Sequence, residues 1–263
     1  MTYFGFLLRF LILPIAVLII IHWHDHRAHR DAPGFDGKKV PLIIAVHILF
    51  ALVYTTPWDN YLVASEVWTY NPELVTGFVL GYVPIEEYTF FVVETLMAGL
   101  WWWFLARRLS LPDRNFKPSP IGRWITFGAL LILWSTFTGL FFFGTDSWNY
   151  LGIILMWALP AIFPQILFGA DLLWHYRKLL FWTILPLGGY LSLTDIVALR
   201  ATTWAISKSQ TSGLRFFGIL PLEEVVFFFI TNILIGFGMT LMLSNLGWER
   251  FQAWKARRFQ GLP

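Results

Sequence analysis

The chain has 263 residues and no cysteine, which excludes disulfide bonds, thiolate metal sites and cysteine nucleophiles. It also has little charge: 13% of its residues are Asp, Glu, Lys or Arg, whereas 57% are hydrophobic. A soluble globule of this length needs more polar surface than such a composition supplies. Together with a mean hydropathy of +0.62, the composition indicates an integral membrane protein.

Several classes of site lack the residues that they require. No Gly-rich fingerprint follows a strand pattern, so nothing indicates a dinucleotide or flavin fold. The last apolar segment has no Lys for the Schiff base of a retinal protein. The six histidines are too few for a membrane di-iron enzyme, so we interpret residues 22–29 as a solvated loop and expect no metal site. The 19 Lys and Arg lie mostly in short loops, where they indicate topology and not nucleic-acid binding.

Seven apolar segments are long enough to cross a bilayer as helices, which takes about 20 residues. We expect them at about residues 3–23, 40–58, 75–105, 124–143, 150–173, 179–199 and 216–244. The first has no cleavage site and is expected to be a retained helix. The third is longer than a span requires, and Pro84 within it predicts a break or bend. The predicted fold class is all-α, a polytopic membrane protein.

The loops predict the orientation, because Lys and Arg are retained on the cytoplasmic side. The segments after the first, third, fifth and seventh helices are basic, whereas those after the second and fourth carry only acidic charges. The loop after the sixth helix departs from this alternation, since it holds Arg200, Lys208 and Arg215. We expect a multi-pass protein of the cell membrane with its N-terminus outside and its C-terminus in the cytoplasm.

One four-residue motif occurs twice, each time at the head of an aromatic, apolar segment. It reads Pro84-Ile85-Glu86-Glu87 in the first copy and Pro221-Leu222-Glu223-Glu224 in the second. Proline is tolerated at the first position of a helix, so each copy predicts a helix restart with two Glu in its first turn. A carboxylate at membrane depth is costly and is by default a functional-site hypothesis. Desolvation favours the neutral acid and the helix N-terminus favours the carboxylate, so we expect a general acid beside a base.

The spacing around the motif predicts an internal repeat. Asp59 lies nine residues before Trp68, and Asp195 lies nine before Trp204; the motif follows each Trp by 16 or 17 residues. We therefore expect a first three-helix repeat over residues 1–108, a linker helix over 109–145, a second three-helix repeat over 146–250 and a basic cytoplasmic tail over 251–263. An odd linker makes the two repeats parallel, which would bring both motifs to one depth at their interface.

Three more carboxyl groups are candidates for a supporting role. Glu94 lies seven residues after Glu87 and so on the same helical face, where its counterpart in the second repeat is Thr231. Asp59 and Asp195 lie at matched helix ends, where we favour solvated caps over a part in the site. Most of the 15 Trp and 26 Phe are expected to face lipid or to pack. Some of them would line a pocket and stabilise a cation.

The segments 84–91 and 221–228, each closing a three-helix unit, resemble the Pro-x-Glu-Glu-x-x-Phe-Phe motifs of the small-subunit type of membrane lycopene cyclases. The similarity spans about residues 3–244 and matches the fused form of a family that also occurs as two short chains and as a domain of bifunctional fungal enzymes. It implies an intramolecular lyase that closes β-ionone rings at the ends of lycopene, giving γ-carotene and β-carotene, without the flavin of unrelated cyclases.

The resemblance places the acid and the base among four carboxyl groups without ranking them. These are Glu86, Glu87, Glu223 and Glu224. The expected partners are lycopene and the lipid bilayer, with other carotenoid-pathway enzymes as candidates, and no cofactor is expected. Two other functions stay open. A carotenoid hydratase would capture the same cation with water, and a small-solute transporter would share the layout of two parallel three-helix repeats.

Overall fold

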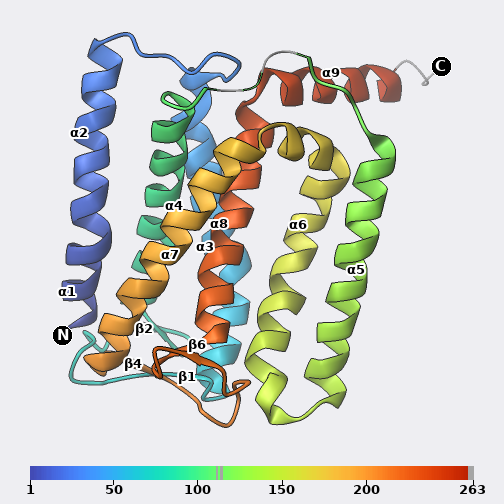
Figure 1. Ribbon diagram of the computed structural model, residues 1–263. Coiled ribbons are helices and arrows are strands. Elements are labelled where there is room, and N and C mark those ends of the chain that lie inside the picture. The colour runs from blue at the N-terminus through green and yellow to red at the C-terminus, as the bar shows by residue number, and fades with distance from the viewer. Residues whose placement is uncertain (111, 113–114, 260–263) are drawn as a thin grey trace.

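The computed structural model describes residues 1–110, 112 and 115–259. Seven of its helical segments are long and apolar enough to cross a membrane, and they form the upright bundle of Figure 1. They are α1 (Tyr3–Leu7), which continues through the π-helix Leu8–Ile12 into α2 (Leu13–Arg27), α3 (Val40–Ala64), α4 (Ile85–Ala106), α5 (Pro120–Phe143), α6 (Asn149–His175), α7 (Arg177–Arg200) and α8 (Leu222–Leu243). The prediction of an all-α, multi-pass membrane protein is confirmed.

Two helices begin later than predicted. The third was expected from residue 75 and the seventh from residue 216, but α4 begins at Ile85 and α8 at Leu222. The residues before each helix form a short hairpin instead, β2 (Val79–Leu80) with β3 (Val83–Pro84), and β5 (Arg215–Phe216) with β6 (Leu220–Pro221). Each hairpin turns at a glycine with positive φ, Gly81 at +69° and Gly218 at +70°. Short apolar runs fit a strand as well as a helix, which is why hydropathy missed both hairpins.

The two motif prolines therefore cap their helices and do not interrupt them. Pro84 has φ −67° and ψ 149°, and Pro221 has φ −60° and ψ 146°, so both are extended residues that precede the first helical turn. The prediction that each proline occupies the first helical position was wrong by one residue. Because a hairpin and not a helical segment stands directly before each proline, the paired Glu lie at one end of the bundle and not halfway along a span.

Strands β1 (Trp68–Tyr70) and β4 (Trp204–Ile206) form an antiparallel ladder at the end of the bundle that holds the hairpins (Figure 1). Thr69 lies opposite Ala205, and Trp68 lies opposite Ile206. The predicted repeat makes Trp68 the counterpart of Trp204, and therefore Thr69 the counterpart of Ala205. With that correspondence, the observed register relates β1 to β4 by a local two-fold axis that passes between Thr69 and Ala205. The ladder supports the predicted parallel repeat, which stays a prediction for the chain as a whole.

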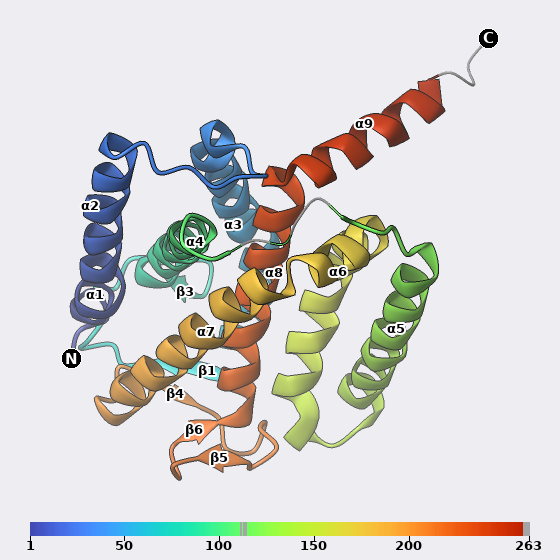
Figure 2. The same ribbon diagram turned by 45° about the horizontal axis from the view of Figure 1, so that its top comes forward.

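One further helix follows the last span. Helix α9 (Asn245–Phe259) projects sideways from the opposite end of the bundle (Figure 2). Its Arg250 forms a two-pronged ion pair with Asp171 of α6, at 2.7 and 2.9 Å, and donates to the Phe168 carbonyl oxygen at 2.7 Å. The tail predicted over 251–263 is thus helical as far as residue 259. Its residues 260–263, like residues 111 and 113–114 of the predicted linker segment, lie outside the described part of the chain.

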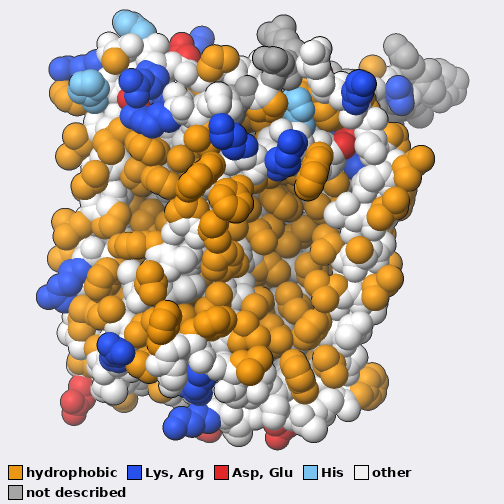
Figure 3. All heavy atoms as spheres, viewed as in Figure 1, with side chains coloured by type: hydrophobic (Ala, Val, Ile, Leu, Met, Phe, Trp, Pro, Cys, Tyr) orange, Lys and Arg blue, Asp and Glu red, His pale blue; other side chains and the backbone are white. Residues whose placement is uncertain are grey.

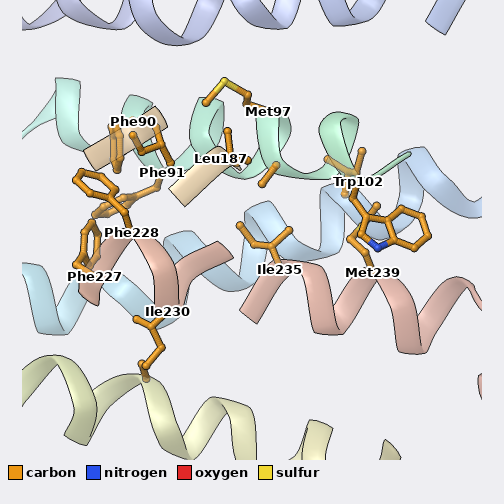
Figure 4. Packing of buried hydrophobic residues seen from close by; sticks show 14 of the residues in the cluster. Phe90, Phe91, Met97, Trp102, Leu187, Phe227, Phe228, Ile230, Ile235 and Met239 are labelled. Atoms are coloured by element: carbon orange, nitrogen blue, oxygen red, sulfur yellow. The ribbon is translucent and has the colours of Figure 1, made fainter. Parts of the chain in front are cut away.

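Helices α4 and α8 are the most buried spans, and α8 runs through the centre of the bundle in Figures 1 and 2. Figure 4 shows Phe90 and Phe91 of α4 packed beside Phe227 and Phe228 of α8. Lipid is as apolar as these side chains, so close packing and interhelical hydrogen bonds hold such helices together. On the outside, apolar side chains cover the middle of the face in Figure 3, and most visible Lys and Arg lie toward the α9 end.

A buried ion pair near the α9 end generates a test of this fold. Asp25 of α2 accepts two hydrogen bonds from Arg108, at 2.8 and 2.9 Å, and Arg107 lies 3.5 Å from it. We expect Asp25→Asn to lower the free energy of unfolding by about 2 kcal/mol or more, because the guanidinium groups lose their counter-charge. The measurement is the thermal unfolding midpoint in detergent. In the control, Asp36→Asn removes an exposed pair with Lys39 and should cost less than about 1 kcal/mol; equal shifts would contradict this account.

Candidate active site

The first Glu of each motif accepts a hydrogen bond from the backbone of the loop that leads into the adjacent hairpin. Glu86 Oε1 accepts from the amide of Thr76 at 2.6 Å, and Glu223 Oε1 accepts from the amide of Ser212 at 2.7 Å. Both side chains are buried, and the second oxygen of each has no hydrogen-bond partner among the described residues. The two carboxyl groups therefore fix the hairpin segments to the starts of α4 and α8.

The second Glu of each motif accepts hydrogen bonds from aromatic side chains. Glu87 Oε2 accepts from the hydroxyl groups of Tyr3 and Tyr70, the latter at 3.0 Å. These donors reach Glu87 from α1 and from strand β1.

Glu224 has a matching pair of donors. Its Oε1 accepts from the Trp68 indole at 3.2 Å and from the Tyr150 hydroxyl at 2.6 Å. Tyr150 comes from α6, whereas Trp68 comes from β1 in the other predicted repeat. Each second Glu is thus buried and oriented by two donors that are distant in the sequence.

Tyr70 lies outside the membrane-spanning segments. Its burial, and next to that the charge of Glu87, raise the pKa of the Tyr70 hydroxyl well above its usual value near 10. The group therefore stays protonated, and remains a donor to Glu87, throughout the neutral range.

Carboxyl groups of both motifs meet at one small cavity. Glu87 and Glu224 line it together with Asp195, and its volume of about 30 Å³ has room for no more than about two water molecules. The predicted meeting of the motifs is thus observed for the second Glu of each, whereas Glu86 and Glu223 are not among the described residues that line this cavity. The small cavity thus brings together carboxyl groups from α4, α7 and α8 in a space that holds almost no water.

The two aspartates were expected to be solvated caps, and that prediction was wrong. Asp59 is 0% exposed and Asp195 is 1% exposed, because the ladder of β1 and β4 and the hairpins cover this end of the bundle. Asp195 accepts from the Trp204 indole at 2.8 Å and lines the small cavity. Asp59 has no hydrogen-bond partner for either oxygen within the described chain.

A second cavity, of about 840 Å³, runs between α3, α4, α6, α8 and α9. This volume lies within the range of about 300–1,000 Å³ that is usual for small-molecule sites. Its lining is mostly apolar and aromatic, but it includes Glu94, which accepts from the Thr231 hydroxyl at 3.1 Å. Glu94 is displaced from Glu87 by roughly 10 Å along α4. Phe90 and Phe227 line both cavities and thus lie between the large cavity and the small one that holds Glu87 and Glu224.

A ladder of stacked aromatic rings follows the wall of the large cavity toward the carboxyl groups. Phe50 stacks on Tyr54 at 4.9 Å between ring centroids, Tyr54 on Trp157 at 5.8 Å, Trp157 on Trp58 at 4.7 Å and Trp58 on Phe227 at 5.5 Å. Three of these rings recur every fourth residue along α3, a spacing that could have revealed a common face in the sequence. The ladder presents aromatic faces that attract a cation.

Comparison with known proteins finds named relatives. A protein of Halobacterium salinarum named lycopene beta-cyclase is 36% identical over 211 residues, which are 80% of this chain and 86% of that protein. The bifunctional lycopene cyclase/phytoene synthase of Podospora anserina is 36% identical over 240 residues, 87% of this chain and 38% of the fungal protein. The protein of the same name from Aspergillus oryzae is 33% identical over 231 residues, 86% of this chain and 37% of that protein. No protein-family model and no solved structure matches the chain.

The role of Glu223 as a backbone acceptor can be tested by its stability effect. We expect Glu223→Ala to lower the free energy of unfolding by about 1–3 kcal/mol, because the half-buried Ser212 amide loses its partner. Glu223→Gln retains an acceptor oxygen and should keep most of that stability. The measurement is the thermal unfolding midpoint, with the exposed Glu73→Ala as the control. Equal midpoints for the Ala and Gln variants would show that the hydrogen bond contributes little.

Proposed function

Because this chain belongs to the lycopene cyclase family, we propose that Glu87 and Glu224 are the acid–base pair with which it cyclises the linear ends of lycopene. The chain is an enzyme, and its reaction is that of an intramolecular lyase, an isomerisation. The observation that carries the proposal is the meeting of Glu87 and Glu224 in one dry cavity lined by aromatic rings. Since the relatives are named for a β product, the proposed product carries β-ionone rings.

The reaction needs one proton donor and one proton acceptor. The acid protonates the terminal double bond of lycopene and leaves a tertiary cation, and the neighbouring double bond attacks this cation to close a six-membered ring. A carboxylate then removes a ring proton, and the electron pair of that C–H bond forms the ring double bond. One proton enters and another leaves, so the product has the mass of the substrate. The acid ends ionised and the base ends protonated, and a proton transfer between them restores the starting state.

The surroundings of the pair suit a carbocation. Phe90, Phe227 and Phe228 line the small cavity, and their ring faces attract positive charge. The cavity is too small for an end of lycopene as it stands, so the proposal requires Phe90 and Phe227 to swing aside and join the two cavities. The end group then displaces the remaining water, which favours loss of a proton over capture by water and thus a cyclase over a hydratase. The apolar lining of the large cavity suits a carotenoid better than a polar transported solute.

The contacts divide the four motif carboxyl groups into two kinds. Glu86 and Glu223 are engaged with backbone amides, so we assign them to positioning the helix starts. Asp195 shares the small cavity with the reacting pair and would set the charge state of the pair, and the buried Asp59, which has no hydrogen-bond partner in the described chain, would support it. Glu94 stands on the wall of the large cavity and would contact the polyene away from the reacting end.

We also propose the orientation and internal symmetry indicated by the sequence. The N-terminus would lie outside the cell membrane and the C-terminus in the cytoplasm, with residues 1–108 and 146–250 as parallel repeats joined by the linker over 109–145. Two observations support this arrangement: the described termini lie at opposite ends of the bundle in Figure 1, and β1 pairs with β4 in a two-fold register. The carboxyl cavity would then lie toward the outer surface of the bilayer. Other enzymes of the carotenoid pathway stay candidate partners.

The function is tested in bacterial cells that accumulate lycopene and express this chain. Pigments are extracted and separated by chromatography with mass detection. We expect γ-carotene and β-carotene, both with the mass of lycopene. A product heavier by one water would identify a hydratase instead. Unchanged lycopene beside a well-inserted protein would overturn the proposed activity.

The roles assigned to the four motif carboxyl groups predict that their Gln variants will differ in the rate of ring formation. Glu87→Gln and Glu224→Gln should each lower ring formation at least about 100-fold, because general acid–base catalysis contributes roughly 10²–10⁴-fold. Glu86→Gln and Glu223→Gln keep an acceptor for the loop amide and should stay within about tenfold of the wild type. Initial rates in membranes with equal amounts of protein give the comparison. A loss as large in the second pair as in the first would refute the division.

A further inference from the structure

The large cavity has one end toward the carboxyl groups of the motifs and one end toward α9. Its lining along α8 runs from Phe227 to Met242, roughly 22 Å at about 1.5 Å per residue. At one end, Phe90 and Phe227 close it off from the carboxyl groups. At the other end its lining includes Trp248 and Phe251 of α9. The cavity is therefore long and narrow, and it is covered by α9 at the end away from the chemistry.

Helices α3 and α6 form its side walls, and they are joined only near the closed end among the described hydrogen bonds. The Tyr54 hydroxyl donates to the Trp157 carbonyl oxygen at 2.8 Å, and the Trp157 indole donates to the Tyr54 carbonyl oxygen at 3.3 Å. Toward α9, the lining residues Val46 and Phe50 of α3 are 42% and 47% exposed. This stretch of the α3 wall is therefore not covered by another helix.

The wall of α6 opposite them is irregular. Pro160 and Pro164 lie inside the helix and line the cavity, and Gly169 interrupts the helical dihedral angles one residue beyond the lining residue Phe168. Proline removes a backbone hydrogen bond and bends a helix. An interrupted α6 facing an exposed stretch of α3 makes this side of the cavity the place for an opening toward lipid.

We propose that lycopene enters sideways from the bilayer through this opening, which we call the portal and define by Val46, Phe50, Pro164, Phe168 and Trp248. The substrate dissolves in hydrocarbon and is a long, thin polyene, so a lateral opening matches both its location and its shape. One end passes along the aromatic ladder toward Glu87 and Glu224. The other end stays at the portal against α9. This inference rests on the proposed function, because it takes lycopene as the occupant.

The anchoring of α9 fixes one border of the portal. The ion pair of Arg250 with Asp171 ties α9 to α6, and the ammonium of Lys39, the residue before α3, lies 4.3 Å from the centre of the Trp248 ring. Trp248 and Phe251 thus lie between the two portal walls, where their rings would contact the unreacted end of the substrate. They are specificity-determining residues in this proposal, since their size limits what can occupy that end.

The absence of cysteine from the chain makes a direct test possible. Val46→Cys introduces a single thiol at the portal, and Leu49→Cys introduces one on the same helix at a residue that is 63% exposed and does not line the cavity. Each variant is treated in membranes with a small or a bulky methanethiosulfonate reagent, and mass spectrometry verifies complete modification. Initial rates of lycopene cyclisation are then measured before and after a reducing agent removes the adduct.

We expect the bulky adduct on Val46→Cys to lower the rate at least tenfold, the small adduct to lower it less, and reduction to restore it. The same adducts on Leu49→Cys should leave the rate within twofold. Phe168→Cys serves as a second portal variant if Val46→Cys is inactive before modification. Unchanged rates with bulky adducts at a portal position would overturn the portal. Failure of the unmodified wild type to cyclise lycopene would refute the proposed function itself, so the two failures are distinguishable.

Discussion

The structure depends on hydrogen bonds to carboxyl groups that are buried away from water. A carboxyl group in such a place is costly unless donors surround it, and this fold supplies donors of two kinds. Amides of the loops that lead into the hairpins bind Glu86 and Glu223, while aromatic hydroxyl and indole groups bind Glu87 and Glu224. These contacts hold the helix starts, the loops and strand β1 together, so the same groups that stabilise this end of the bundle also form the proposed site.

The hydrogen bonds of the two motifs match at the first Glu of each copy and differ at the nearby tryptophans. The loop contacts of Glu86 and Glu223 match closely, at 2.6 and 2.7 Å. Trp68 and Trp204, which the predicted repeat would make equivalent, have different partners: Trp68 donates to Glu224 in the other predicted repeat, whereas Trp204 donates to Asp195 in its own. An acid and a base must differ in proton affinity to do different work. This exchange of partners is the kind of difference that lets two similar carboxyl groups take opposite roles.

The proposed reaction also requires a site without bulk water and with aromatic rings beside the cation. A tertiary cation in contact with water would be captured, so a cyclase has to replace solvent with groups that tolerate positive charge. The small cavity, with its volume of about 30 Å³, excludes bulk water, and the phenylalanine rings at its boundary take its place. The large cavity extends the same apolar surface over most of a helix length. In the proposed entry route, the position of the carboxyl groups at one end of this cavity gives the long substrate a single direction along the bundle.

The sequence by itself determined the membrane class, the seven spans, the doubled motif and, through that motif, the family. These are local properties, since hydropathy and a short motif depend only on neighbouring residues. Only the tertiary structure decided that Asp59 and Asp195 are buried, that α4 and α8 begin after hairpins, and that Tyr150 and Trp68 bind Glu224 across 74 and 156 residues. Such contacts depend on how distant helices pack, and no hydrophobic period records which aromatic group will meet a given carboxylate.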